Sequence, residues 1–395
     1  MKKITTILLL VMILLSLVPG IVTAAIVDPP SIVAHLKAGE TERDTITVNL
    51  PPTSPKGDVV FIFDASSSMA SELTEMKTKA SDIMTSVRAN VPDTNFGVGS
   101  IVDYPFPYNS YGYDASYGGP GDYAWRMDQD LTSNTALIST AFNGITILHG
   151  DDFPQDYVRG LYESQFYAWR TDAKKIVVII GDAPPHAEPS GSTLPAPYTL
   201  GVYGGDPGRD EVMLTADDLN FTPVVQSLAD NKIVVIAVDC SDGKPLAADA
   251  TRAFQYEADK TGGTRFDSTS TTIAEDIVAK INAVTSAPVS TLTLIVREPA
   301  YSGWISVTPP EYLNVPWGTT KTFDVAITPP ADTISGTYVL HLDVFGDGVL
   351  LGTTTLTKTI GSIPGVPEFP TLLFPAVSII GFLGAVLLIL RTREH

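Results

Sequence analysis

Unbroken hydrophobic runs in the middle of the chain alternate with segments whose apolar residues recur at helical spacing. The runs Val59–Phe63, Ile176–Ile180 and Ile233–Val238 are rich in β-branched residues, as is typical of strands buried on both faces of a parallel sheet. Helical spacing follows the first run, over Leu73–Val87. This alternation predicts a doubly wound α/β domain, which we assign to residues 56–286.

Shorter segments with alternating polarity flank this region. Ser31–Leu36 and Thr45–Leu50 precede it and are typical of a hairpin or of two neighbouring strands. Further strands are predicted beyond Pro288, at Thr291–Val296, Trp304–Val307, Thr322–Ile327, Tyr338–Val344 and Thr353–Thr359. Their close spacing indicates a β-sandwich. Because an isolated hairpin is marginally stable, we predict that residues 28–52 pair with strands of 288–360, with the α/β domain inserted between them.

Both ends of the chain are apolar. The start is basic, continues into the apolar run Ile7–Val18 and then into small residues, the pattern of a secretory signal peptide over residues 1–24. Residues 371–390 are long and apolar enough for a transmembrane helix, and the arginines in 391–395 predict a basic cytoplasmic tail. We therefore expect an exported protein held at the extracellular face of the cell membrane.

The charge of the chain disfavours one class of partner, and its cysteine content limits the covalent links it can form. The chain has 25 basic and 44 acidic residues, a net charge of −19, which disfavours nucleic-acid binding and favours cation binding. The single cysteine, Cys240, excludes an intrachain disulfide. It ends an apolar strand, so we expect it to be a small packing residue.

The first candidate functional residues come directly after the first buried strand. Asp64, Ser66 and Ser68 alternate on a loop at the carboxyl end of that strand, where open α/β sheets bind ligands. Such oxygen ligands suit Mg²⁺, Mn²⁺ or Ca²⁺, although the same residue types also cap helices. Other acidic loops carry Asp103, Asp151 with Asp152, and Asp182. If these loops converge on one edge of the sheet, their repulsion requires a cation.

These residues resemble the metal sites of von Willebrand factor A-type domains, specifically the variety found in integrin β subunits. Asp64-x-Ser66-x-Ser68 resembles the first loop of the metal-ion-dependent adhesion site (MIDAS), and Asp182 resembles its distal aspartate. Asp152-Phe-Pro-Gln155 resembles the Asp-x-Pro-Glu loop of the family, with glutamine in place of a glutamate that bridges two metals.

The resemblance implies further sites as well. Asp103 corresponds to an aspartate of a neighbouring synergistic metal site, and Glu72 to one of two acids of a third, adjacent site. It implies Mg²⁺ or Mn²⁺ at the central site and Ca²⁺ at an adjacent one. The implied central ligands are Asp64, Ser66, Ser68 and Asp182, with Gln155 or Asp152 direct or through water. Integrin β subunits have this domain inserted into an immunoglobulin-like hybrid sandwich, which matches the order of segments here.

A site of this kind binds rather than catalyses. Its serines are neutral, so the ion keeps excess positive charge and an open position for a carboxylate of a partner. The resemblance thus implies a non-enzymatic cell-surface adhesion module for a protein ligand that presents Asp or Glu. Residues 104–130 form either an adaptable recognition loop or a packed lid. The recognition candidates are Tyr104, Tyr108, Tyr111, Tyr113, Tyr117, Tyr123 and Trp125.

Two other functions remain open: a surface-layer component with a structural metal, and a metal-assisted phosphoester hydrolase. The hydrolase is disfavoured because no histidine or lysine is convincingly paired with a nucleophile. Residues 361–370 contain Pro367-Glu368-Phe369, and with the following helix and basic tail they resemble the archaeal PEF-CTERM sorting signal. That resemblance implies an archaeosortase-like processing enzyme that exchanges the helix for a lipid anchor, the alternative being a plain transmembrane anchor.

Overall fold

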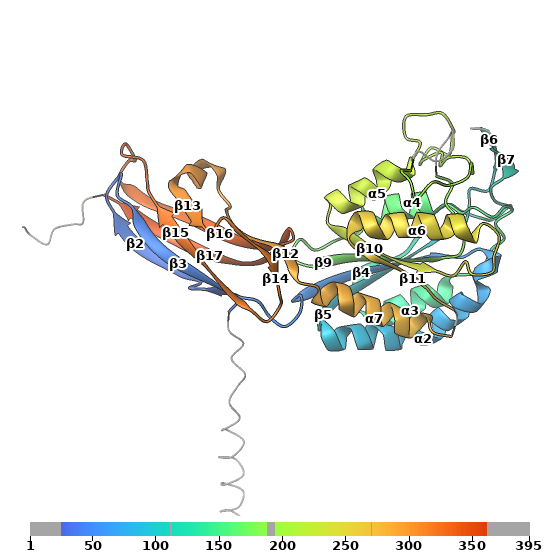
Figure 1. Cartoon of the computed structure of the whole chain (residues 1–395), viewed down its shortest axis with the longest axis horizontal. Helices are drawn as coiled ribbons and strands as arrows, with labels where there is room; N and C mark the ends of the chain where they lie inside the picture. Colours follow the sequence, from blue (N-terminus) through green and yellow to red (C-terminus); the bar gives the residue numbers. More distant parts are fainter. Residues whose placement is uncertain (1–24, 111–112, 188–193, 270, 362–395) are drawn as a thin grey trace, which may run out of the picture.

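The computed structural model describes residues 25–110, 113–187, 194–269 and 271–361, which form two lobes (Figure 1). One lobe is a mixed α/β layer structure, and the other is built from strands. Each lobe has hydrophobic clusters of its own. The predicted division into an α/β part and a β-rich part is therefore confirmed.

The α/β lobe is built on a six-stranded sheet with the strand order β11-β10-β9-β4-β5-β8. Its strands are β4 (Lys56–Asp64), β5 (Asp93–Ile101), β8 (Arg126–Thr132), β9 (Lys174–Gly181), β10 (Ile233–Asp239) and β11 (Thr264–Asp267). All neighbours are parallel except β8, which is antiparallel to β5. From β4 the chain first builds outward through β5 and later continues on the other side through β9. Loops diverge at such a reversal, which is where open α/β sheets hold ligands.

Helices cover both faces of this sheet. One face packs against α2 (Ala70–Asn90), α3 (Thr135–Gly144) and α7 (Ile273–Ser286). The other packs against α4 (Tyr157–Ser164), α5 (Phe221–Asp230) and α6 (Ala247–Thr261). Alternate residues of β4 enter the two cores, Phe61 on one side and Ile62 on the other. Burial on both faces explains why the central strands are continuously apolar.

Some elements at the edge of this lobe were not predicted from the sequence. β8 and the hairpin of β6 (Pro107–Ser110) and β7 (Tyr113–Ser116) lie in or beside the segment 104–130, which was expected to be a long loop. β8 carries charged residues and is half-buried, as an edge strand can be, so its hydrophobic pattern is weak.

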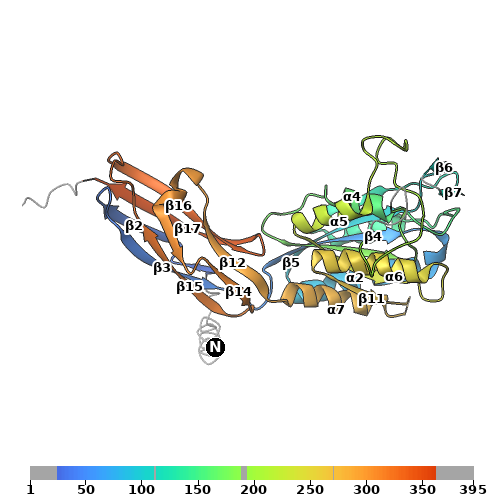
Figure 2. The same ribbon diagram turned by 45° about the horizontal axis from the view of Figure 1, so that its top comes forward.

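The β-rich lobe is a sandwich of two sheets (Figure 2). The first has the order β1-β3-β15-β13 and the second β14-β12-β16-β17-β2. The first sheet contains β1 (Val27–Asp28), β3 (Glu42–Asn49), β13 (Ile305–Thr308) and β15 (Thr320–Ile327). The second contains β2 (Ser31–Leu36), β12 (Val289–Val296), β14 (Glu311–Val315), β16 (Gly336–Gly346) and β17 (Val349–Ile360). β14 and the first residues of β17 were not predicted.

The two N-terminal strands do not form a hairpin, because they lie in different sheets. β3 pairs with β15, placing Ile46 opposite Phe323, and β2 runs parallel to β17, placing Ile32 opposite Leu356. The prediction that these segments pair with strands beyond residue 288 is confirmed. The α/β lobe follows β3 and precedes β12, so it interrupts the sandwich in sequence.

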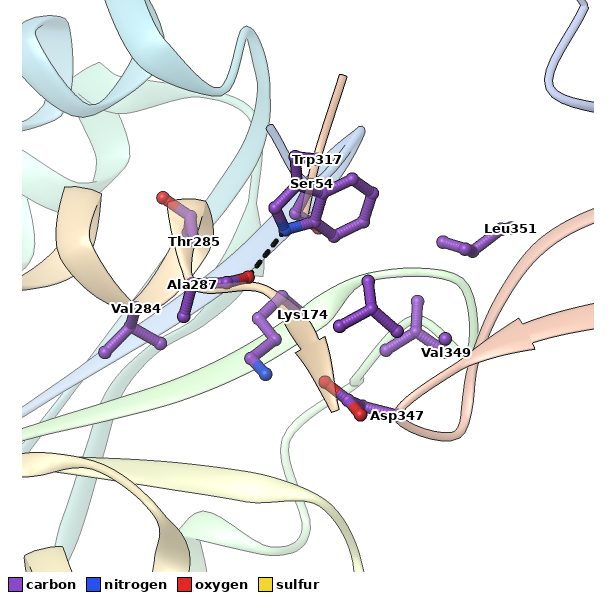
Figure 3. Close-up of a pocket in the computed structure, with 11 residues that line it drawn as sticks. Ser54, Lys174, Val284, Thr285, Ala287, Trp317, Asp347, Val349 and Leu351 are labelled. Carbon is purple, nitrogen blue, oxygen red and sulfur yellow. Dashed lines mark hydrogen bonds between the residues drawn. The ribbon is translucent and has the colours of Figure 1, made fainter. Parts of the chain in front are cut away.

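The two crossings between the lobes lie next to each other. Ser54 N donates to Thr285 O at 3.2 Å, and Trp317 Nε1 donates to Ala287 O at 2.8 Å. Figure 3 shows the small pocket at this junction, where Lys174 of β9 lies near Asp347 of the sandwich. Burial lowers the pKa of Lys174, and the charge of Asp347 opposes that effect.

Within residues 25–361, apart from the gaps named above, no helix is long and apolar enough to cross a membrane. The expected signal peptide (1–24), most of the sorting segment (361–370), the transmembrane helix (371–390) and the basic tail (391–395) lie outside the described residues.

Candidate metal and ligand site

The loop after β4 forms a compact oxygen cluster. One oxygen of the buried Asp64 carboxylate accepts from Ser66 N at 2.8 Å. The hydroxyls of Ser66 and Ser68 then lie side by side, 3.2 Å apart. Ser66 immediately precedes the short helix η1 (Ser67–Met69), yet its side chain makes no capping hydrogen bond. Helix capping therefore does not account for these side chains, which remain available to hold a cation.

Tyr157 of α4 joins this loop to the one after β9. Its hydroxyl donates to the second oxygen of Asp64 and accepts from Asp182 N at 3.0 Å. Burial raises the pKa of Asp64 to about 7, and the negative charge of Asp182 adds to this effect. The close approach of the Tyr157 ring also requires glycine at position 181, because a Cβ there would overlap the ring. Tyr157 thus links the two loops that carry the predicted aspartates, at the point where the strand order reverses.

A pocket collects most of the predicted central ligands. It is lined by Ser66, Ser67, Ser68, His149, Gly150, Asp151, Asp152, Phe153, Gln155, Asp182, Ala183, Lys244 and Pro245. The structure therefore brings together the loop of Ser66 and Ser68, the Asp152–Gln155 loop and Asp182, although they are distant in sequence. Oxygen donors of this kind fit a hard divalent ion such as Mg²⁺ or Mn²⁺.

Lys244 is part of this pocket and was not predicted. Its ammonium group contacts the carboxylate of Asp182 and donates to Ser68 O at 3.0 Å. Burial acts to lower the pKa of Lys244, but the hydrogen bond and charge of Asp182 outweigh it, so the pKa is raised. Lys244 lies on the loop after β10, the strand beside β9, and this position was the signal that could have indicated its place near Asp182. Its positive charge lies where a metal ion would contact Asp182.

Asp103, Asp152 and His186 form a second, more deeply buried cluster that could hold a metal ion. His186 Nε2 lies 3.4 Å from Asp103 Oδ1 and 3.7 Å from Asp152 Oδ1. None of these three buried atoms has a hydrogen-bond partner among the described residues. His186 Nδ1 faces the carbonyl of Tyr203, so it acts as the donor and directs the lone pair of Nε2 toward the carboxylates.

Neighbouring side chains hold the carboxylates and the imidazole of this cluster in place. Tyr113 donates to Asp152 Oδ2 at 2.7 Å. With its amide oriented to satisfy both polar ends, Gln155 donates to Asp103 Oδ2 at 3.0 Å. The ring of Tyr117 stacks on His186, with centroids 3.6 Å apart. One oxygen of each carboxylate is thus held while the other stays free to bind an ion.

Charge in this cluster is strongly unbalanced. Burial raises the pKa of Asp103 well above its usual range, and the charges of Asp156 and Asp152 add to the effect. Converging, unpartnered donors with excess negative charge fit a bound cation. One imidazole nitrogen beside two carboxylates suits Mn²⁺ or Zn²⁺ better than Ca²⁺, because Ca²⁺ prefers oxygen ligands only. His186 was not among the ligands predicted from the sequence.

Glu72 belongs to neither cluster, although its negative charge helps to raise the pKa of Lys244 in the central pocket. It is buried in the first turn of α2, and its carboxylate accepts from Ser71 Oγ at 2.8 Å. Among the described residues it neither lines the central pocket nor belongs to a metal-ligand group. The third site inferred from the resemblance therefore gains no geometric support.

The tyrosine-rich segment packs mainly inward. Tyr104 and Tyr117 are buried, and the hydroxyl of Tyr104 donates to Asp206 Oδ1 at 2.9 Å. The hydroxyl of Tyr123 lies 2.8 Å from Ser100 Oγ, and Trp125 packs against Tyr167. For Tyr104 and Tyr117, burial favours the packed lid over the recognition loop, because their polar tips find partners inside the lobe. The side chain of Tyr108 and all of Tyr111 lie outside the described part.

No protein-family model matches the chain, and no curated protein matches its sequence. Among solved structures, the pilus adhesin SpaC from Lactobacillus rhamnosus GG, in its open conformation, is 12% identical. The alignment covers 81% of this chain and 45% of the SpaC chain, with a TM-score of 0.39. Proximal thread matrix protein 1 from the mussel byssus is 14% identical over 61% of this chain and 48% of its own, with a TM-score of 0.37. The chain thus spans less than half of either protein, and the similarity is too low to support a functional argument.

Proposed function

We propose that this protein is a cell-surface adhesion module that binds a carboxylate of a protein partner through a divalent ion. The ion is held by Asp64, Ser66, Ser68 and Asp182, with Gln155 or Asp152 completing the site. The observation that carries the proposal is the paired serine hydroxyls, 3.2 Å apart, beside two aspartates that Tyr157 holds together. Since the hydroxyls are neutral, an ion bound there keeps the charge needed to attract a carboxylate.

In this proposal the α/β lobe is a von Willebrand factor A-type domain of the integrin β variety, and the strand-built lobe is its immunoglobulin-like hybrid sandwich. The interruption of the sandwich between β3 and β12 supports the comparison. Mg²⁺ or Mn²⁺ occupies the central site, and the Asp103–Asp152–His186 cluster takes a second ion. In this second cluster His186 supplies the nitrogen ligand beside the two carboxylates.

We also propose that the chain is exported and held on the outer face of an archaeal cell. This part rests on the sequence pattern of residues 1–24 and 361–395, with an archaeosortase-like enzyme acting near Phe369. Mass spectrometry of the mature protein is expected to find neither the first 24 residues nor those after Phe369. An intact C-terminal segment would instead mean a plain transmembrane anchor.

The central site is tested by the variant Asp64→Asn, which keeps the shape of the side chain and removes its charge. We expect calorimetric titration with Mg²⁺ and with Mn²⁺ to show affinity at the central site weakened by at least about tenfold. Asp332→Asn, an exposed aspartate of the sandwich, is the matched control and should behave as wild type.

Partner binding is tested by recovering surface proteins on the immobilised wild-type chain, in Mg²⁺ and in chelator. We expect partners that are retained only in Mg²⁺ and are lost with Asp64→Asn. Unchanged metal affinity in that variant would contradict the site. Metal binding without any metal-dependent partner would favour the surface-layer role, and turnover of generic phosphoesters would favour the hydrolase.

A further inference from the structure

A lysine lies in the interior of the sandwich. Lys358 is on β17 between Leu356 and Ile360, whose side chains enter the hydrophobic core. The side chain of Lys358 is 0% exposed. Lysine is almost never fully buried unless it has a partner, because removing an ammonium group from water is costly. Its position therefore requires an explanation from the residues that face it.

Two acids face Lys358 from the opposite sheet. Glu42 and Asp44 occupy alternate positions of β3 and continue the inward-facing row of Ile46 and Val48. Lys358 Nζ lies 2.5 Å from Glu42 Oε2 and 3.2 Å from Asp44 Oδ2. The acid side chains are 22% and 19% exposed, so the three groups meet largely away from water.

Neighbouring strands make the surroundings mostly apolar. Ala34 and Tyr338 lie beside Lys358 in register, while Ile327 and Val325 lie beside the two acids. One carboxylate is enough to pair with one ammonium, so the second acid is in excess. The neutral amine and the neutral acid are the forms that react with each other. Holding reacting groups in contact can replace a very high concentration of free reactants.

We propose that Lys358 and Asp44 become joined by an amide bond within the folded chain, with Glu42 as the proton-transfer group. A proton passes from the ammonium to Asp44, giving a neutral amine and a neutral acid. The Nζ lone pair then attacks Cγ of Asp44. Glu42, the acid nearest to Nζ, takes a proton from the nitrogen and delivers it to the departing hydroxyl. One C–N bond forms, one C–O bond breaks and one water leaves, without any oxidant, reductant or cofactor.

This bond would connect the two sheets covalently. Asp44 and Lys358 are 314 residues apart, and the α/β lobe lies between them in sequence. The chain has a single cysteine and cannot form an intrachain disulfide for the same purpose. The inference concerns the sandwich alone and does not depend on the metal site.

Peptide mapping of the denatured full-length chain tests the proposal directly. Trypsin cleaves after Arg43, which separates the two acids into Ala38–Arg43 and Asp44–Lys56. We expect the peptide that contains Lys358 to be uncleaved at that lysine and joined to Asp44–Lys56, with the loss of one water. Ala38–Arg43 should be released free. A wild-type chain with no cross-linked peptide, or one linked through Ala38–Arg43, would overturn the proposal.

Two variants separate the chemistry from folding. Glu42→Gln keeps both reacting groups, and we expect it to fold and to lack the cross-link; an undiminished cross-link would overturn the role of Glu42. Lys56→Arg is the control, because Lys56 forms a salt bridge with Asp172 in which both side chains are more than one-third exposed. This variant should retain the cross-link of Lys358, and Lys56 of the wild type should be cleaved normally.

Discussion

At the scale of single residues, Lys244 gives the central pocket a cation of its own. Its ammonium group contacts Asp182 and Ser68, two residues of the proposed metal site. The two cations cannot occupy the same side of Asp182, so metal binding requires Lys244 to move away. If the proposed ion binds, the loop after β10 would therefore be coupled to the occupancy of the site.

This competition predicts that Lys244→Met binds Mg²⁺ and Mn²⁺ more tightly than wild type. We expect a gain on the order of tenfold, because the ion no longer displaces a bound ammonium group. Calorimetric titration measures the change. Lys260→Met, which removes an exposed lysine of α6, controls for net charge and should change little. Equal affinities for Lys244→Met and wild type would show that the lysine does not compete.

At the scale of secondary-structure elements, α6 contains a buried acid whose loss of hydration is not offset by hydrogen bonds from the described residues around it. Glu257 is fully buried, and neither of its carboxylate oxygens has a hydrogen-bond partner among the described residues. Burial alone raises its pKa well above the ordinary value of 4.5. The folded state thus binds a proton that the unfolded state releases, and this acid costs stability once the pH rises above 4.5.

Glu257→Gln is therefore expected to be more stable than wild type at neutral pH, by roughly 1–3 kcal/mol. The difference should shrink as the pH falls toward 4.5, where the unfolded glutamate also binds its proton. Urea unfolding at both pH values gives the two free energies of unfolding. A variant that is equally stabilised at low and neutral pH would rule out titration as the cause.

The strength of the hydrophobic signal explains which elements and site residues were predictable. β4 and β9 are apolar on both faces, so their ends, and with them Asp64 and Asp182, were located correctly. β8 is a charged edge strand and has no such signal. Lys244 and His186 join their clusters through loop conformations, which periodicity does not encode. The burial of Tyr104 and Tyr117 likewise depends on distant partners, such as Asp206 and Gly205.

At the scale of the whole molecule, the sandwich depends on both sides of the interruption. β3 lies between β1 and β15, so residues 288–361 alone lack an interior strand of one sheet. The hydrogen bond between Ser54 and Thr285 shows that the two crossings are adjacent. A short linker can therefore replace the α/β lobe without displacing either half.

We expect residues 25–52 joined to 288–361 by a short Gly/Ser linker to fold, with cooperative thermal unfolding followed by circular dichroism. Residues 288–361 alone should show no such transition, because the apolar face of β15 would lose its neighbour. Cooperative folding of the shorter fragment would mean that β3 is dispensable.

The direction of β17 determines how the protein would carry mechanical load. Val349 lies at the junction between the lobes, while Ile360 ends the strand where the chain continues past residue 361. β17 pairs with β16 along nearly its whole length and with β2 over its final residues. A pull between a partner on the α/β lobe and the chain beyond residue 361 would act along this strand. The backbone hydrogen bonds would then be loaded together in shear instead of separating one after another, so the sandwich would resist force before it yields.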